Sequence, residues 1–241
     1  MAFKLTTMLQ RQSFHPNWIG VFVNPFYFAR AGLAKSIERH ASVLTGRLLD
    51  IGCGTKPYQD FFHVEEYLGL DIDSESSRER GIADYFYDGN TFPVESESFD
   101  SVLCNQVLEH VFNPDTFLCE VHRILKFDGK LLLTVPFVWD EHEQPFDYAR
   151  YSSFGLNALL EKNGFRIIRH EKIGTDATTL FQLINGYLYK ISAGWQKYIR
   201  FIFTVLVMGS LNLLGIAVAK MLPKNSDFYL DQLVIAEKAY R

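Results

Sequence analysis

Residues 47–57 of the 241-residue chain read RLLDIGCGTKP, and this stretch decides the fold. It begins with the short apolar run Arg47–Ile51, which is typical of a buried parallel strand, and it continues into two closely spaced glycines. Glycines at the carboxyl end of a first strand let the backbone turn sharply and come close to a ligand. The stretch therefore predicts a strand that leads into a ligand-binding turn.

A carboxylate follows this turn at an informative interval. Asp71 lies at the end of the next apolar run, Glu66–Ile72, and stands 19 residues after Gly52. This is the place and spacing of an acid that accepts hydrogen bonds from two ribose hydroxyls. Pro57 occupies the place of the third glycine in a dinucleotide fingerprint, and the phosphate-loop ending G-K-[ST] is absent. The pattern therefore indicates a nucleoside ligand but argues against NAD, FAD or a nucleoside triphosphate.

Strands and helices alternate through the middle of the chain. Beyond the first two strands, we expect strands at Asp84–Tyr87, Ser101–Cys104, Lys130–Val135, Arg166–His170 and Gln232–Glu237. One helix is expected to be capped by Asn113, to begin at Pro114 and to end before Asp128-Gly129. A second is capped by Ser152 or Ser153 and ends near Asn163-Gly164. This alternation predicts an α/β fold with a doubly wound sheet.

Composition excludes several classes of protein. Hydrophobic residues make up 48% of the chain and charged residues 22%, which argues against a disordered, collagen-like or coiled-coil chain. The formal charge of −4 disfavours a nucleic-acid partner. Three scattered cysteines suit neither a disulfide framework nor a four-thiolate zinc site, and we see no secretion signal, so a reducing, cytoplasmic setting is expected.

Four stretches carry a resemblance to a known family: LLDIGCGTKPY, YLGLDID, YDGNTFPVESESFDSVLCNQVLEHV and RILKFDGKLLLTVPF. Over about Leu48–Phe137 the chain resembles the class I S-adenosylmethionine (SAM)-dependent methyltransferases of the small-molecule "LDIGCG" type, similar to methyltransferase type 11. The resemblance implies a Rossmann-like, mostly parallel seven-stranded sheet and SAM as the cofactor. Lys56 departs from the family's fuller pattern, which often has a third glycine there.

The resemblance also implies which residues contact SAM. Gly52 and Gly54 pass close to the methionyl part, and Asp50 helps to place its ammonium group. By the same resemblance, Asp71 holds the ribose, and Ile72, Asp88 and Gly89 lie at the adenine. Asn105 lies beside the methionyl chain.

A loop dense in acids and aromatics, residues 138–151, follows the predicted Lys130–Val135 strand and is placed to cover the methyl acceptor. His142 is the leading candidate for a general base because an imidazole titrates near neutrality. Pairing of His142 with Glu141, Glu143 or a backbone carbonyl is an equal alternative. Candidate substrate contacts are Glu143, Arg150 and Tyr151, although Arg150 could instead form a structural salt bridge with Asp147.

Two other reactive side chains, His110 and Cys104, are expected to have mainly structural roles. His110 is a weaker catalytic candidate, for which helix packing is the safer expectation. We expect no metal site at Glu141–Glu143, because adjacent residues rarely converge on one ion and no second cluster has helical ligand spacing. Cys104 is expected to be a small buried hydrophobic residue and not a nucleophile.

The segment Phe201–Ala219 contains 19 residues without a charge. As a helix it would measure about 28 Å, close to the roughly 30 Å thickness of a bilayer's hydrocarbon core. A single crossing would put the final strand on the wrong side of the membrane, and both flanks are basic, which favours a cytoplasmic location for both ends. We therefore expect a re-entrant hairpin broken near Gly209-Ser210 or a helix lying on the bilayer. The alternative is a helix buried between protomers or against Phe22–Phe28.

These observations give the expected organisation: an N-terminal helical cap (1–46), a SAM-binding core (47–175), an apolar helical insertion (176–226) and a final strand (227–241). The expected activity is SAM-dependent methyl transfer, O-directed, to a small-molecule or lipid-linked acceptor. The expected location is the cytoplasm, peripheral or monotopic at the inner face of the cell membrane. A SAM-binding regulatory module without transfer is the alternative, and a homo-oligomer is left open.

Overall fold

The computed structural model describes residues 12–239. The chain divides into two compact units. Within the described residues, the sheet unit comprises residues 37–137, 141–171 and 232–239, and the helical unit comprises residues 12–36, 138–140 and 172–231. Each unit is described by itself.

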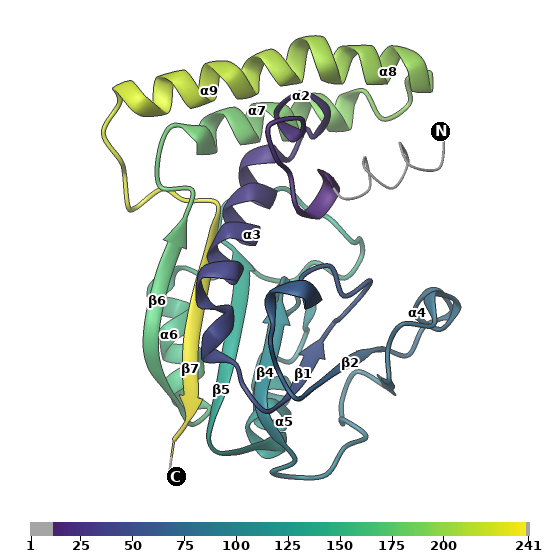
Figure 1. The fold of residues 1–241 in the computed structure, drawn as a ribbon, viewed down its shortest axis with the longest axis vertical. Helices are drawn as coiled ribbons and strands as arrows, with labels where there is room; N and C mark the ends of the chain where they lie inside the picture. Colours follow the sequence, from purple (N-terminus) through teal and green to yellow (C-terminus); the bar gives the residue numbers. More distant parts are fainter. Residues whose placement is uncertain (1–11, 240–241) are drawn as a thin grey trace. The chain divides into compact units, whose positions relative to one another are not determined.

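The sheet has seven strands in the order β3-β2-β1-β4-β5-β7-β6. The strand bounds are Arg47–Ile51 (β1), Glu66–Ile72 (β2), Tyr85–Tyr87 (β3), Phe99–Asn105 (β4), Leu125–Pro136 (β5), Phe165–Ile173 (β6) and Asp231–Lys238 (β7). Strand β1 pairs in parallel with β2 and β4, β2 pairs in parallel with β3, and β4 with β5. The arrow of β7 points opposite to that of β6 (Figure 1). The predicted doubly wound, mostly parallel sheet is confirmed.

The register of the sheet aligns the strand ends that matter for the site. Ile51 at the end of β1 faces Leu70 on β2 and Cys104 on β4. Because these three strands are parallel, the residues that follow Ile51, Leu70 and Cys104 emerge at the same edge. The turn after β1 therefore meets the ends of β2 and β4.

The helices of the sheet unit include α4 (Glu75–Arg80), α5 (Pro114–Ile124) and α6 (Ser153–Lys162), with short 3₁₀ turns at Ala41–Val43 (η1), Gln59–Phe61 (η2) and Leu108–His110 (η3). Helices α5 and α6 lie on one side of the sheet (Figure 1). Phe117 and Leu118 of α5 and Leu156 of α6 are buried in one core cluster with strand residues. Each such burial stabilises the fold by about 1.5–3 kcal/mol.

Two local predictions around α5 need correction. The helix begins at Pro114 as expected, but the side chain of Asn113 makes no capping hydrogen bond within the described residues. The helix ends at Ile124, before Asp128-Gly129 as expected, but the next strand, β5, begins at Leu125 directly after α5 instead of at the predicted Lys130, so that Asp128-Gly129 lie inside it. Leu125 already pairs with Phe99 of β4, and a register irregularity accommodates the extra length. At α6, Ser152 is the cap, and it accepts a hydrogen bond from Gly155 N at 3.2 Å.

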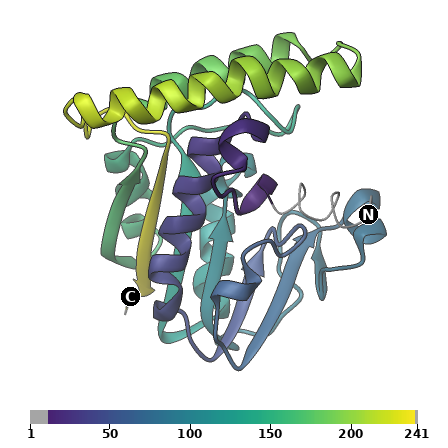
Figure 2. The same ribbon diagram turned by 45° about the horizontal axis from the view of Figure 1, so that its top comes forward.

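The helical unit contains α2 (Gly20–Val23), the first part of α3 (Tyr27–His40), and α7 (Thr178–Ile191). It also contains α8 (Lys197–Phe203), the π-helical segment η4 (Thr204–Met208) and α9 (Gly209–Met221). The last three form one uninterrupted helix of 25 residues, Lys197–Met221, which is apolar enough and long enough to cross a membrane. Helix α7 runs beside it in both views (Figures 1 and 2).

The predicted break near Gly209-Ser210 is therefore wrong. Gly209 has ordinary helical dihedrals, φ −61° and ψ −41°. A Cβ there would lie 3.1 Å from the Cα of Phe22, so this glycine serves close packing of the helix on α2. Likewise, a Cβ at Gly215 would approach Phe28 and Phe181 at 2.9 Å. One face of the apolar helix thus packs against the Phe22–Phe28 segment, which agrees with one part of the alternative, but most of the helix is not buried.

The helical unit buries polar side chains and exposes apolar ones, which is the reverse of an ordinary pair of helices in a soluble protein. Buried amide side chains join its helices: Asn185 Nδ2 donates to Asn212 Oδ1 at 2.9 Å, and Asn212 Nδ2 donates to Val21 O at 2.8 Å. Large apolar side chains point outward, including Leu206, which is 65% exposed. Only 28% of the most apolar window of the long helix is buried.

Candidate active site

The turn after β1 has a closed side and an open side. Gly52 and Gly54 adopt φ +68° and φ +51°, and Gly52 N donates to Leu70 O at 2.8 Å. A Cβ at Gly52 would overlap the side chain of Val107, whereas a Cβ at Gly54 would meet no described atom within 4 Å. The turn is therefore fixed against the sheet at Gly52 and accessible to a ligand at Gly54.

Lys56 preserves this turn, although the family pattern that the sequence resembles often has glycine there. Its backbone adopts φ +50°, in the left-handed region that glycine favours. Its Nζ lies 2.7 Å from Asp84 Oδ2, and the same oxygen accepts a hydrogen bond from Gly69 N at 2.7 Å. The ion pair holds the lysine side chain toward β2.

Asp71 lies at the end of β2, as predicted, and is 8% exposed. Its Oδ1 accepts a hydrogen bond from Ile72 N at 2.9 Å, and its Oδ2 pairs with Arg80 Nη2 at 3.0 Å. The neighbouring Ile72 side chain is 42% exposed and leaves an apolar surface beside the carboxylate.

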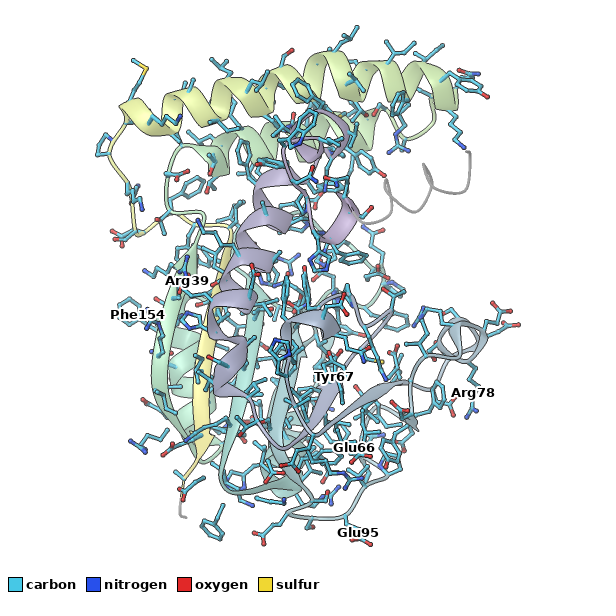
Figure 3. The ribbon with its side chains drawn as sticks, viewed as in Figure 1. Arg39, Glu66, Tyr67, Arg78, Glu95 and Phe154 are labelled. Atoms are coloured by element: carbon cyan, nitrogen blue, oxygen red, sulfur yellow. The ribbon has the colours of Figure 1, made fainter. Side chains whose placement is uncertain are left out.

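Asp50 is buried one residue before the end of β1 and accepts a hydrogen bond of 2.7 Å from the hydroxyl of Tyr67. Tyr67 is labelled on β2 in Figure 3. Burial raises the pKa of Asp50 to about 7, and the negative charge of Asp71 adds to this rise. Asp50 is thus a carboxyl group poised between its two protonation states near neutral pH.

The Asp88-Gly89 turn lies against the exposed side chain of Ile72. Asp88 Oδ1 accepts hydrogen bonds from Asn90 N at 2.9 Å and from Thr91 N at 3.1 Å, which lowers the pKa of Asp88. Gly89 adopts φ +90°, and a Cβ there would lie 3.6 Å from Ile72 Cδ1. At the end of β4, Asn105 Oδ1 accepts a hydrogen bond of 2.8 Å from Thr134 Oγ1.

The two candidate catalytic histidines come together in the sheet unit. His110 ends the 3₁₀ turn η3, and its ring centroid lies 4.8 Å from that of His142 with an interplanar angle of 80°. His110 Nδ1 is 2.9 Å from Phe146 O, and His142 Nδ1 is 3.3 Å from Asp147 Oδ2. Burial lowers the pKa of His110, so its ring favours the neutral form.

Arg150 forms the structural ion pair that the sequence left as an alternative. Its Nη1 and Nη2 donate to the two oxygens of Asp147 at 2.5 and 2.7 Å. This pairing, with a smaller contribution from the backbone N–H of His142, lowers the pKa of Asp147 to about 2. Glu143 is exposed with φ +50°, and the half-buried Tyr151 packs against the core. Substrate contact by Glu143, Arg150 and Tyr151 stays a prediction.

Several neighbours of these residues escaped the sequence analysis. Glu109 is fully buried beside His110, but a carboxylate in a polar-looking turn gives no sign of burial in the sequence. Tyr67 reaches Asp50 from the neighbouring strand, and Arg80 reaches Asp71 from α4, so both depend on the fold. Cys104 is fully buried and its pKa is raised by burial, in agreement with its predicted role as a small hydrophobic residue.

Comparison with known proteins shows which family these residues are similar to. Residues 49–133 match the family described as "Methyltransferase domain". An uncharacterized protein of Methanocaldococcus jannaschii, MJ1123, is 34% identical over 104 residues, which cover 42% of this chain and 49% of that protein. The uncharacterized methyltransferase YcgJ of Bacillus subtilis is 30% identical over 99 residues, covering 36% of this chain and 39% of that protein. These matches span about half or less of the curated relatives' lengths.

Solved structures share the fold at low sequence identity. Phosphoethanolamine N-methyltransferase 2 of Haemonchus contortus, solved in complex with S-adenosyl-L-methionine, matches with a TM-score of 0.54 and 19% identity. The match covers 94% of this chain and 58% of that protein. The Rossmann-like architecture predicted from the sequence is therefore confirmed.

Proposed function

Because residues 49–133 match the family described as "Methyltransferase domain", we propose that this chain is a SAM-dependent methyltransferase that transfers the methyl group of SAM to an acceptor oxygen. The observation that carries the proposal is the pairing of a turn open at Gly54 with the buried carboxylate of Asp71 on the adjacent strand. A nucleoside placed there would meet an acceptor for its ribose hydroxyls beside a backbone that it can approach closely.

The residues at this edge fit SAM. The space at Gly54 would admit the methionyl chain, and Asp71 would hold the ribose. The 42% exposed Ile72 would pack on adenine, with the Asp88-Gly89 turn beside it. SAM supplies a methyl group on a sulfonium whose positive charge disperses as the methyl moves. The buried Asp50 would favour a cationic ligand once it is ionised.

The protein's main task is then to place the acceptor in line with the methyl group and to exclude water. Such orientation can contribute about 7–11 kcal/mol. An acceptor hydroxyl also has to lose its proton, and an imidazole is suited to accept it near neutral pH. We assign this role to His142, which Asp147 orients through Nδ1. His110, with its ring against that of His142, is the second candidate.

The helical unit supports an acceptor at a membrane. Its long helix carries exposed apolar side chains while amide groups are buried inside, an arrangement that favours contact with lipid. Lys197, Arg200 and Lys220 provide basic groups near the two ends, suited to anionic headgroups. The chain enters this unit after β6 and leaves it into β7 of the same sheet, so both ends belong on one side of the bilayer. A helix lying on the cytoplasmic surface satisfies these constraints.

The alternative is a SAM-binding module without transfer, and a direct assay separates the two. Purified chain is incubated with SAM carrying a tritiated methyl group and with lipid or soluble-metabolite extracts. The proposal expects label in an acceptor only when the protein is present, and none with Asp71→Ala. Tight SAM binding without label in either extract would support the module instead. Label in the lipid fraction would support a lipid-linked acceptor, and label in the soluble fraction a free one.

A further inference from the structure

Glu109, His110 and His142 form a cluster that the cofactor site leaves unused. One ligand atom from each lies within 4.8 Å of the other two. The residues come from two segments: Glu109 and His110 from the turn η3 after β4, and His142 from the loop after β5. The expectation of no metal at Glu141–Glu143 rested on adjacent residues and on helical ligand spacing, and neither pattern predicts that two separate segments converge here.

We propose that Glu109, His110 and His142 bind a divalent first-row transition cation, with a further coordination position left for an acceptor oxygen. Two imidazoles and one carboxylate are a ligand set that suits Zn²⁺, Mn²⁺, Fe²⁺ or Co²⁺. Metal–ligand bonds of about 2.0–2.2 Å place ligand atoms roughly 3.4 Å apart in a tetrahedral site. The present separation of 3.8 Å between His110 Nε2 and Glu109 Oε1 is close to this value.

The surroundings of His110 leave one nitrogen directed to the cluster. Its Nδ1 is 2.9 Å from the backbone oxygen of Phe146, which can only accept a hydrogen bond. Nδ1 therefore carries the proton, and Nε2, on the side of Glu109, keeps its lone pair. A backbone carbonyl that fixes the tautomer in this way is a common partner of metal-binding histidines.

His142 is oriented in the same manner by a carboxylate. Asp147 Oδ2 accepts the backbone N–H of His142 at 2.9 Å and lies 3.3 Å from His142 Nδ1. Arg150 Nη2 is 3.4 Å from the same nitrogen of His142. The shorter hydrogen bonds of the Arg150 guanidinium, at 2.5 and 2.7 Å, go to the carboxylate of Asp147. In the tautomer in which Nδ1 donates to Asp147, Nε2 of His142 keeps its lone pair and is the ligand atom.

The carboxyl group of Glu109 lies inside the fold, beside the loop that carries His142. The carboxylate is fully buried within η3, where a negative charge is costly unless a positive charge lies close to it. The loop that carries His142 is tied to this residue, because Tyr148 N and Ala149 N donate to Glu109 O at 2.8 and 3.2 Å. The two segments that supply the ligands are therefore joined independently of any metal.

The role of the cation, unlike the site itself, rests on the proposed methyl transfer. A bound cation would lower the pKa of a coordinated acceptor hydroxyl, and its proton would pass to water. The oxygen lone pair then forms the O–C bond, and the C–S bond of SAM breaks with its electron pair going to sulfur, giving S-adenosylhomocysteine. In this state His142 is a ligand, and the cation replaces it as the group that activates the hydroxyl.

Binding of Co²⁺ to untagged, chelator-treated protein tests the site. We expect one equivalent to bind with visible absorption bands of a nitrogen-containing coordination sphere, and Zn²⁺ to displace it. His142→Ala and the isosteric Glu109→Gln should each weaken binding at least about 10-fold. His63→Ala, which removes an exposed histidine of the same unit, is the matched control and should leave binding unchanged.

The overturning results are equally specific. The proposal fails if the unaltered protein binds no Co²⁺, or if His142→Ala and Glu109→Gln, shown to be folded by circular dichroism, bind it as the unaltered protein does. SAM titrations run in parallel separate this proposal from the proposed function. Normal Co²⁺ binding without SAM binding would refute the methyl transfer and leave the metal site standing, and the reverse result would refute the site alone.

Discussion

The hydroxyl of Tyr67 donates a hydrogen bond of 2.7 Å to Oδ2 of Asp50, and this carboxyl group is only 4% exposed. The contact links the second strand to the first, one residue before the glycine turn. Because burial raises the pKa of Asp50 to about 7, the group changes its charge near neutral pH. The hydrogen bond from Tyr67 opposes that rise, since it favours the ionised form.

We predict that SAM affinity rises with pH between about 5.5 and 7.5. The ionised form of Asp50 favours the positive charges of SAM, and below a pKa of about 7 the ionised fraction falls, by up to about tenfold per pH unit. Calorimetric titrations across this range measure the dependence. Asp50→Asn should bind weakly with a flat profile. An equally steep profile in Asp50→Asn would show that another group is responsible.

Asp50 should also shape the pH dependence of folding in the ligand-free chain. Its folded pKa lies above the usual value of 3.8, so the folded state binds the proton more tightly. The stability that this proton confers is present below pH 3.8 and is lost as pH rises through about 7. We predict that Asp50→Asn melts at a higher temperature than the unaltered chain at pH 8 and at a similar temperature at pH 4. A lower melting temperature at pH 8 would contradict this assignment.

The two glycines of the turn should respond differently to substitution. Gly52→Ala would force a Cβ into the side chain of Val107, so we predict a clear fall in melting temperature. Gly54→Ala has space for its Cβ and loses only about 1–2 kcal/mol to the left-handed backbone. It should fold but bind SAM more weakly, because the methyl group enters the ligand's space. Thermal melts and calorimetry on both variants check this difference.

Unchanged SAM binding by Gly54→Ala would contradict the proposed position of the methionyl chain. If Gly54→Ala binds SAM as tightly as the unaltered chain, the open side of the turn is not where the methionyl chain passes.

For the helical unit, we predict that the outward apolar face carries membrane binding. Ile202 and Leu206 are 55% and 65% exposed and lie one turn apart on the long helix. The double variant Ile202→Glu, Leu206→Glu should lose co-sedimentation with vesicles of phosphatidylethanolamine and phosphatidylglycerol. Substituting exposed residues is cleaner than deleting Phe201–Ala219, because Gly209 and Asn212 hold the unit together.

Phe154→Glu provides the control for this experiment. Phe154 is 84% exposed on α6 and points away from the sheet (Figure 3). The substitution Phe154→Glu adds one acidic group at an exposed apolar position outside the helical unit. Equal sedimentation of the double variant and the Phe154 variant would refute a membrane role for the long helix.

The sequence was most informative where local chemistry and long-range structure coincide. The strands β1 and β2 were predicted with their observed bounds, because an apolar run that ends in glycines or an acid has few other interpretations. The start of β5 was missed, since Asp128-Gly129 reads as a turn and only pairing of Leu125 with Phe99 reveals the strand. The break at Gly209 was wrong because glycine in a helix also permits close packing.

At the site, the positions of the predicted residues followed from topology, but their partners did not. Parallel strands bring Asp50, Asp71 and Asn105 to one edge, and this could be inferred from spacing alone. The pairing of Arg80 with Asp71 and of Asp147 with His142 depends on the exact paths of α4 and of the loop after β5. Tyr67 and Glu109 gave no local signal, because burial of a polar side chain is a property of the folded core.

The central claim is that Asp71 holds the ribose of SAM at the end of β2, and calorimetric titration of SAM into two matched variants tests it. Asp71→Ala removes up to two hydrogen bonds to a charged group, each worth about 1.5–3 kcal/mol, so affinity should fall at least about 30-fold. Asp73→Ala, two residues on, removes an exposed carboxylate paired with Arg78 and should change affinity by less than about threefold. Equal affinities of Asp71→Ala and the unaltered chain, or no SAM binding by the unaltered chain, would contradict the account.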